Sequence, residues 1–307
     1  MAPQSAAFEQ HREAVRARLR EANLPRSGPD SITWKVNREI VVVAGWGRAI
    51  LLQLAHPLVA AGVDEHSSFR GSLRASLWRL HSTVDAMLSL TFGTEEDVIS
   101  AAAGINVIHD RVNGALRAPA GAYPAGEKYS AHDPELLRWV HATLLDSVPL
   151  TYELLVGPLS HEERDRYCVE AAVMEPLLDI PAGSLPRNTR ELETYMAETL
   201  DRGRIAVSER SRGLARSVLF PPRWTLAWPM FRPVQLITIG LLPPAVRDAY
   251  GFGWSSADAR ALRRWTRALR LLRRLLPRVA REFPSARRGR TAPPPSAPAR
   301  QAPTRTP

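Results

Sequence analysis

The spacing of apolar residues along the chain predicts helices wherever it is regular. Between residues 73 and 87 apolar side chains recur every three or four positions, and the same spacing returns over 98–116, 137–148 and 262–276. Side chains at this spacing line one face of an α-helix. Runs with the alternation of a β-strand are scarce, and no internal repeat stands out. The pattern predicts an all-α fold.

Polar residues mark where some of these helices begin and break. Thr94 and Asp97 have the spacing of an N-cap residue and its capping partner. Asp133 is followed by a proline, a pair typical of an N-cap and the first helical position. His56 also precedes a proline, which disfavours helical geometry at the histidine, so we expect a break at that point.

The longest apolar run, residues 40–63, is long enough to cross a membrane. Arg48, Gln53 and His56 lie within it, and a charged residue at mid-bilayer costs roughly 2.5–3.5 kcal/mol. We therefore expect a buried helix of a folded domain there. A second apolar region, 219–244, is interrupted every few residues by proline, which predicts that no long helix runs through it.

Composition divides the chain into three segments. Residues 1–30 are polar and charged and predict an N-terminal polar helical arm, whereas residues 31–284 hold the apolar positions of a single multi-helix globular domain. Residues 285–307 are rich in Pro, Ala and Arg and predict a disordered tail. The first 23 residues contain no apolar stretch like that of a secretory signal, so we expect a cytoplasmic protein.

The net charge of +10 is concentrated at the C-terminal end of the chain. Residues 251–307 contain 14 Arg and only two acidic residues, so the rest of the chain is close to neutral. A basic C-terminal end on a near-neutral body does not support nucleic-acid binding by the main domain. We therefore expect no nucleic-acid partner.

The helix expected over Arg260–Leu276 carries much of this charge. Its arginines surround a stripe of Trp and Leu, an arrangement that suits peripheral contact with an anionic membrane surface. In the alternative interpretation the stripe packs on the body of the protein and the arginines are solvated. The sequence leaves both interpretations open.

Three other kinds of site are not supported. Gly45 and Gly47 follow an apolar run, as in a dinucleotide-binding turn, but Ile50 occupies the third small-residue position and no alternation of strands and helices follows. The single cysteine, Cys168, excludes a disulfide framework and thiolate-rich metal sites. It has no adjacent base, and no Gly-x-Ser-x-Gly motif is present, so nucleophilic catalysis is not supported either.

Histidines are concentrated in one helical part of the chain. Six of the eight are His56, His66, His81, His109, His132 and His141. An imidazole in an apolar core has to be satisfied by hydrogen bonds or used. His109 falls on the apolar stripe over 98–116 and is expected to face the core. It is either bonded to a backbone carbonyl or a ligand to haem iron, which takes a neutral imidazole in an apolar wall.

A second group of candidates lies on the preceding helices. Arg79 and Thr83 are four residues apart, so their side chains are neighbours at the edge of an apolar stripe. Such a pair could bind a propionate, hold a distal water or polarise dioxygen, or it could be an ordinary surface pair. Between His56 and His66, small residues at 60–62 allow close approach of a helix or a flat ligand.

Taken together, several of these segments resemble the family that includes the rubber oxygenases (latex-clearing proteins) and the MpaB-type oxygenases. The segments that carry the resemblance are "GRAILLQLAHPLVAAGVDEHSSF", the Arg79/Thr83 pair, "INVIHDRVNG" around His109 and "DPELLRWVHATLLDS" around His141. The resemblance extends over about residues 34–284, which is most of the chain.

The resemblance implies an all-α domain that encloses a haem b pocket. His109 would be the proximal iron ligand, Arg79 and Thr83 would line the distal side as catalytic residues, and His56 and His66 are further candidates for contact with the cofactor. Dioxygen activated there would attack a carbon–carbon double bond of an apolar substrate, often an isoprenoid. The cofactor would do the difficult electronic steps, and the protein would supply a ligand, a dry channel and a few polar groups.

Two positions depart from the rubber oxygenases. Ser82 stands where those enzymes have a lysine that can cap the iron, and Asn113 stands where an arginine often follows the haem histidine. The first difference implies an open or water-filled distal site. Both differences, with the absence of a secretion signal, point away from rubber as the substrate. A non-catalytic haem- or lipid-binding protein at the membrane surface is the alternative function.

Overall fold

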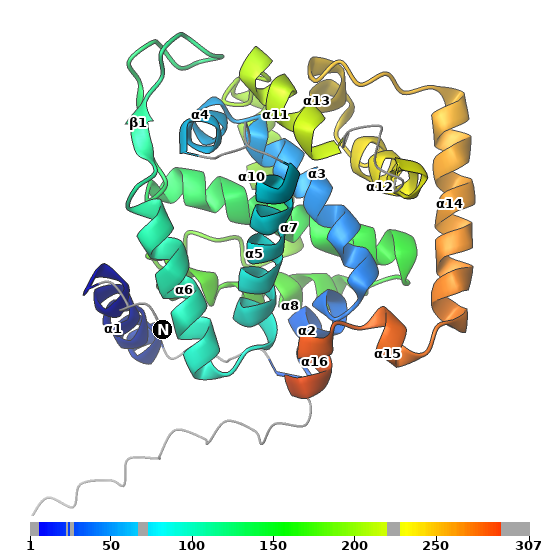
Figure 1. The fold of residues 1–307 in the computed structure, drawn as a ribbon, viewed down its shortest axis with the longest axis horizontal. Helices are drawn as coiled ribbons and strands as arrows, with labels where there is room; N and C mark the ends of the chain where they lie inside the picture. The colour runs from blue at the N-terminus through cyan, green and yellow to red at the C-terminus, as the bar shows by residue number, and fades with distance from the viewer. Residues whose placement is uncertain (1–5, 23, 25–27, 67–72, 220–227, 290–307) are drawn as a thin grey trace, which may run out of the picture.

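The computed structural model (Figure 1) describes residues 6–22, 24, 28–66, 73–219 and 228–289, without the side chains of 73–81 and 228–230. In the N-terminal half the helices are α1 (Ala6–Ala22), α2 (Ile32–Asn37), η1 (Ile40–Val42), α3 (Val43–Leu54), α4 (Pro57–His66), α5 (Leu73–Phe92), α6 (Glu95–His109) and α7 (Pro134–Leu155). The later helices are α8 (His161–Ala171), α9 (Met174–Leu178), α10 (Thr189–Asp201), α11 (Glu209–Leu219), α12 (Trp228–Gly240), α13 (Pro244–Ala249), α14 (Ser256–Leu275), α15 (Arg278–Arg281) and α16 (Pro284–Gly289).

The predicted all-α fold is confirmed, with one small addition. Strands β1 (Asn113–Ala115) and β2 (Lys128–Ser130) form an antiparallel pair in which Gly114 lies opposite Tyr129. This hairpin follows α6 directly and stands beside α4 (Figure 1). The helices otherwise pack on one another around a central pair, α3 and α7.

Helix α3 lies between α7 and α12, and two glycines allow the close approach. A Cβ atom on Gly45 would lie 2.5 Å from Oγ1 of Thr151 on α7, and one on Gly47 would lie 2.5 Å from Oγ1 of Thr238 on α12. Any side chain at either position would therefore push the helices apart. These are the glycines whose spacing resembled a dinucleotide-binding turn, and their role is helix packing.

Arg48 is a buried charge within this packing, and its Nε and Nη1 atoms make three hydrogen bonds. Its Nη1 atom donates to Oδ2 of Asp146 at 2.6 Å and to Oγ of Ser147 at 2.7 Å, and its Nε atom donates to the carbonyl of Leu241 at 2.7 Å. A buried guanidinium is tolerated only when its donors are satisfied in this way. The arginine within the apolar run is thus part of the helix interface.

The expected break at His56 is confirmed. Helix α3 ends at Leu54 and α4 begins at Pro57, and the axis turns by 104° between them. No single helix in the described part of the chain is long and apolar enough to cross a membrane. The bent pair Ile40–Leu54 and Pro57–His66 meets the length and composition requirement jointly.

The predicted helix starts are also confirmed. Thr94 and Asp97 form a reciprocal capping box at the start of α6, and the Asp133 side chain caps α7. The end of α6 differs from the prediction, because the helix stops at His109 and does not continue through Leu116. Val112 packs near Gly62 and Leu116 near Leu58 of α4, so the apolar residues that seemed to extend the stripe are the packing face of the hairpin.

The proline-rich region, through which no long helix was predicted to run, contains one helix of moderate length in its described part. Helix α12 has 13 residues, with Pro233 inside it. Pro229 lies in its first turn, where a backbone N–H has no helical acceptor and a proline costs little. Residues 220–227, which include the first two prolines, lie outside the described residues.

The two ends of the described chain pack on the body. Helix α1 buries Val15 against Ile99 and Ala102 of α6, so the polar N-terminal helix is docked and does not project as an arm. At the other end, α16 includes residues 285–289, the first part of the predicted tail, because Ala286 packs against Trp34 and Phe92. The rest of the predicted tail, 290–307, lies outside the described residues.

Replacing Gly45 by alanine tests the close crossing of α3 and α7. We expect Gly45→Ala to lower the free energy of unfolding by about 1–3 kcal/mol, because its Cβ would overlap Thr151 and the carbonyl of Ser147. Gly104→Ala on α6 is the control, since its Cβ would meet only Phe8 at 4.0 Å and helix propensity favours alanine by up to about 1 kcal/mol. Urea unfolding measures both, and an unchanged stability for Gly45→Ala would contradict this account of the packing.

Candidate functional site

The candidate site is built around the C-terminal end of α6 and the helices beside it. His109 is the last residue of α6, and α5 packs alongside α6 as the other half of a helical hairpin. Thr83 is exposed on α5, and Arg79 lies one turn earlier on the same helix. The side chains of Arg79 and His81 fall outside the described residues.

The imidazole of His109 is partly buried, and one of its nitrogens is free to bind a ligand. Its Nδ1 atom is buried and has no hydrogen-bond partner in the described part of the chain. Burial lowers the pKa of His109 to about 4, with a further lowering from the charge of His132 and an opposing effect from Asp110. The ring is therefore neutral near pH 7, with a nitrogen available to a ligand.

Asp110, the residue after His109, is hydrogen-bonded to two other histidines. One oxygen of Asp110 lies 2.8 Å from Nε2 of His11 on α1, and the other lies 2.8 Å from Nε2 of His132 after β2. These hydrogen bonds, His11 first, lower the pKa of Asp110. The ring of His132 in turn meets the ring of His109 edge-on, with centroids 5.7 Å apart. Both carboxylate oxygens are thus engaged by imidazoles other than that of His109.

His141 on α7 is a second neutral imidazole near His109. It is buried, and its Nε2 atom has no hydrogen-bond partner among the described residues. Burial, followed by the charge of His109, lowers the pKa of His141 to about 4. His141 lines a cavity of about 80 Å³ whose walls include Trp46, Met87 and Leu145. This volume suits a few water molecules at about 30 Å³ each and is far too small for a tetrapyrrole.

His56 and His66 make contacts of their own with the hairpin. His56 is buried at the break between α3 and α4, where its Nε2 atom lies 3.0 Å from the hydroxyl of Tyr123. Burial and then Arg204 lower its pKa to about 4, while Asp133 has the opposite effect. His66 is exposed at the end of α4, and its ring centroid lies 6.3 Å from that of Tyr129.

The end of α4 also carries a partly buried carboxylate, Glu65, whose partners the sequence did not indicate. The hydroxyl of Tyr129 donates to Oε2 of Glu65 at 2.7 Å, and burial with this hydrogen bond raises the pKa of Tyr129 to about 12. Arg117 and Arg210 lie 3.3 and 3.5 Å from the other oxygen of Glu65. Because these partners are far apart in sequence, only the fold brings them to α4.

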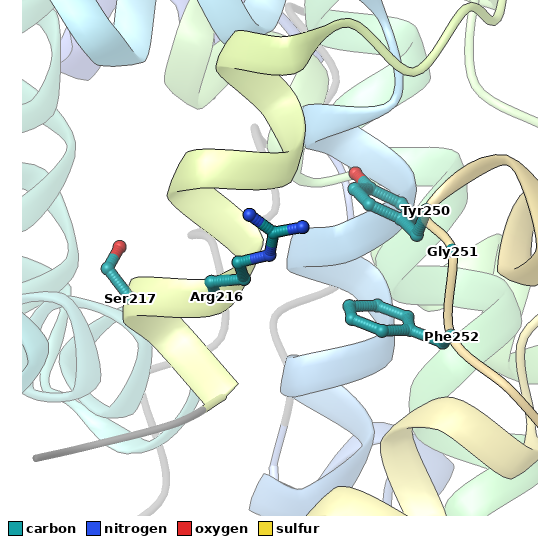
Figure 2. Close-up of a pocket in the computed structure, with 5 residues that line it drawn as sticks. All are labelled: Arg216, Ser217, Tyr250, Gly251 and Phe252. Atoms are coloured by element: carbon teal, nitrogen blue, oxygen red, sulfur yellow. The ribbon is translucent and has the colours of Figure 1, made fainter.

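Two further features lie apart from the candidate histidines. One is an open hollow of about 530 Å³ beside α11. Arg216 of α11 points across it toward Tyr250 and Phe252 (Figure 2), whose rings are stacked with centroids 5.4 Å apart. None of the candidate histidines lines it. Cys168 is buried, and burial raises the pKa of its thiol to about 12, which argues against a nucleophilic role. Within the described ranges, no group of three or more His, Cys, Asp or Glu side chains is placed to hold a metal ion.

Comparison with known families agrees with this architecture. Residues 34–271 match the family described as ER-bound oxygenase mpaB/B'/Rubber oxygenase, catalytic domain. The chain belongs to this family. Comparisons with curated proteins and with solved structures gave no significant match. The matched segment runs from α2 into α14 and contains His109, His141 and the Arg79/Thr83 pair, so the candidate site lies within the oxygenase catalytic domain.

The three neutral histidines make stability depend on pH. The pKa values of His56, His109 and His141 are all lowered to about 4 in the folded state, so between about pH 6.5 and pH 4 the unfolded chain binds more protons than the folded one. We therefore expect stability to fall as the pH drops through this range, by up to about 1.4 kcal/mol per pH unit for each histidine.

Urea unfolding at about pH 7 and about pH 5 measures this dependence. His141→Phe is expected to remove about a third of the pH dependence, because it removes one of three similar groups. His161→Gln, on the exposed surface of α8, is the matched control and should leave the dependence unchanged. A stability that does not change over this range would mean that the three imidazoles are not held neutral.

Proposed function

We propose that the protein is a haem b-dependent oxygenase that acts with dioxygen on the carbon–carbon double bond of an apolar, isoprenoid-type substrate. Membership of the oxygenase family supports the reaction class. The observation that carries the haem assignment is the buried, unpartnered nitrogen of His109, on a ring whose pKa is lowered to about 4. Haem iron takes a neutral imidazole of this kind as its proximal ligand.

The residues around His109 fit the group chemically. Burial keeps the imidazole unprotonated, and the hydrogen bonds of Asp110 are made to His11 and His132, which leaves the ring of His109 to a ligand. When bound, haem b would supply the activation of dioxygen and the redox steps. His109 would hold the iron, and Arg79 and Thr83 on the neighbouring α5 would contact the other side of the group.

The remaining groups of the chain would orient and protect the reactants. The guanidinium of Arg79 would pair with a carboxylate of the cofactor or with negative charge on the oxygen, and the hydroxyl of Thr83 would donate a hydrogen bond there. The small cavity beside His141 would limit that side of the site to a few water molecules. Ser82 leaves room where the rubber oxygenases have a lysine, which favours a small molecule or water at that position.

An optical spectrum of the purified full-length protein tests the cofactor. With adequate haem supply during expression we expect a Soret band, stoichiometric in the wild type and lost in His109→Ala. His161→Gln, exposed on α8 and outside the candidate site, is the control and should retain the band. Protein without haem would overturn the proposal. Stoichiometric haem in His109→Ala would move the ligand to another histidine, with His56, His66 and His141 the next to be tested.

Thr83→Val tests the polar group on the distal side. We expect this variant to keep its Soret band and to consume dioxygen with an isoprenoid alkene such as squalene roughly 100-fold more slowly, because one hydrogen-bond donor to the reacting oxygen is lost. Thr199→Val on α10, whose hydroxyl donates to the carbonyl of Tyr195, is the matched control. Full turnover in Thr83→Val would exclude this role, and haem without turnover in the wild type would make the protein a haem-binding protein.

A further inference from the structure

Large exposed hydrophobic side chains concentrate at one place on the described surface. Five of them lie on α14 and α15: Trp265, Leu271, Leu272, Leu275 and Val279. Leu275 is 75% exposed, and the other four are between 40% and 59% exposed. Scattered single residues of this kind are ordinary, but a contiguous group indicates a binding surface.

The opposite face of α14 is fixed to the protein. Thr266 is buried, Arg273 makes two hydrogen bonds to Glu39 at 2.6 and 2.8 Å, and Arg270 donates to the carbonyls of Glu153 and Leu154. At 100° per residue, Thr266 and Arg273 point to one side of the helix, with Leu271 and Leu275 on the other. The exposed leucines are therefore the outer face of a docked helix.

A row of arginines runs beside these leucines. Arg263, Arg267 and Arg274 lie within about 40° of one another on the helix, between the docked face and Leu271. All three are exposed, and none forms an ion pair with an acidic side chain in the described part of the chain. The one acidic residue of α14, Asp258, is engaged by Ser255 and Arg232. The outer face thus combines an apolar flank with an unneutralised basic flank.

We propose that this α14 surface, made of the five exposed hydrophobic residues together with Arg263, Arg267 and Arg274, binds the surface of an anionic phospholipid bilayer. The arginines would pair with lipid phosphates and carboxylates, and the leucines and Trp265 would enter the boundary between headgroups and acyl chains. Helices with one apolar and one basic flank bind membranes in this orientation, parallel to the bilayer plane.

Charge decides against two other occupants. A second copy of the chain, packed through the same surface about a two-fold axis, would bring two rows of arginines together. The C-terminal residues 290–307 contain three Arg and no acidic residue, so they do not complement the basic flank. An anionic bilayer complements both flanks, because its headgroups would face the arginines and its acyl chains would face the leucines.

The α14 surface is separate from the candidate site. Helix α14 forms one edge of the molecule, and α6 with the β-hairpin forms the opposite edge (Figure 1). Substitutions on the outer face of α14 should therefore leave haem binding at His109 unchanged, and the proposal stands whether or not haem is bound.

Vesicle co-sedimentation of the full chain tests the proposal. We expect binding to vesicles of phosphatidylcholine mixed with phosphatidylserine, weakened by added salt, and little binding to pure phosphatidylcholine. Arg263→Gln/Arg267→Gln should weaken binding about 20- to 30-fold, since each arginine near an anionic surface contributes about fivefold. Leu272→Ser/Leu275→Ser should also weaken it, by removing the inserted side chains.

The matched control is Arg190→Gln/Arg216→Gln, which removes the same charge from exposed positions on α10 and α11. Circular dichroism and the urea midpoint show whether each variant is folded, and all of the substituted side chains are exposed. Equal loss of binding in the control, or no binding to anionic vesicles, would overturn the proposal. So would loss of self-association, or of binding to an acidic protein, in the α14 variants while vesicle binding stays the same.

Discussion

The close crossing of α3 on α7 is the contact on which the rest of the structure depends. Two glycines let α3 approach α7 on one side and α12 on the other, and Arg48 fastens the crossing through Asp146, Ser147 and the carbonyl of Leu241. Because helix interfaces are close-packed, this spacing also fixes the neighbours of both helices. The crossing sets the position of His141 on α7 and of the bend at His56, where α4 turns toward the hairpin.

The same packing explains how several imidazoles in one region differ in their chemistry. Asp110 accepts from His11 and His132 and leaves His109 without a carboxylate partner, while Tyr123 contacts His56. Burial without a charged partner holds the ring neutral, because protonation would place an unpaired charge in an apolar environment. His109 and His141 each keep a buried nitrogen without a hydrogen-bond partner in the described part of the chain. The described residues do not gather three or more such side chains as a multi-histidine metal centre would, and the proposed haem needs only one of these imidazoles.

The sequence predicted the features of this site that depend on local chemistry. The capping box at Thr94, the N-cap at Asp133 and the break at His56 each involve residues within a turn of one another, and all three are confirmed. The predicted end of α6 was wrong. Val112 and Leu116 happen to continue the helical spacing of apolar residues, but they belong to the hairpin region and pack on α4. The partners of Asp110 could not be predicted, since His11 lies 99 residues away and only the docking of α1 brings it there.

The arginines of α14 separate into two groups that the sequence does not distinguish. Arg270 and Arg273 bind carbonyls and Glu39, and they hold the helix on the body, whereas Arg263 and Arg267 face outward. The two interpretations of this helix are therefore not exclusive, because its inner face packs and its outer face stays open. The match to the oxygenase catalytic domain ends at residue 271, so the more C-terminal exposed side chains, Leu272, Leu275 and Val279, lie beyond it. The proposed membrane surface thus straddles the end of the catalytic domain. Substitutions on this surface should have little effect on His109, because α14 and α6 lie at opposite edges of the molecule.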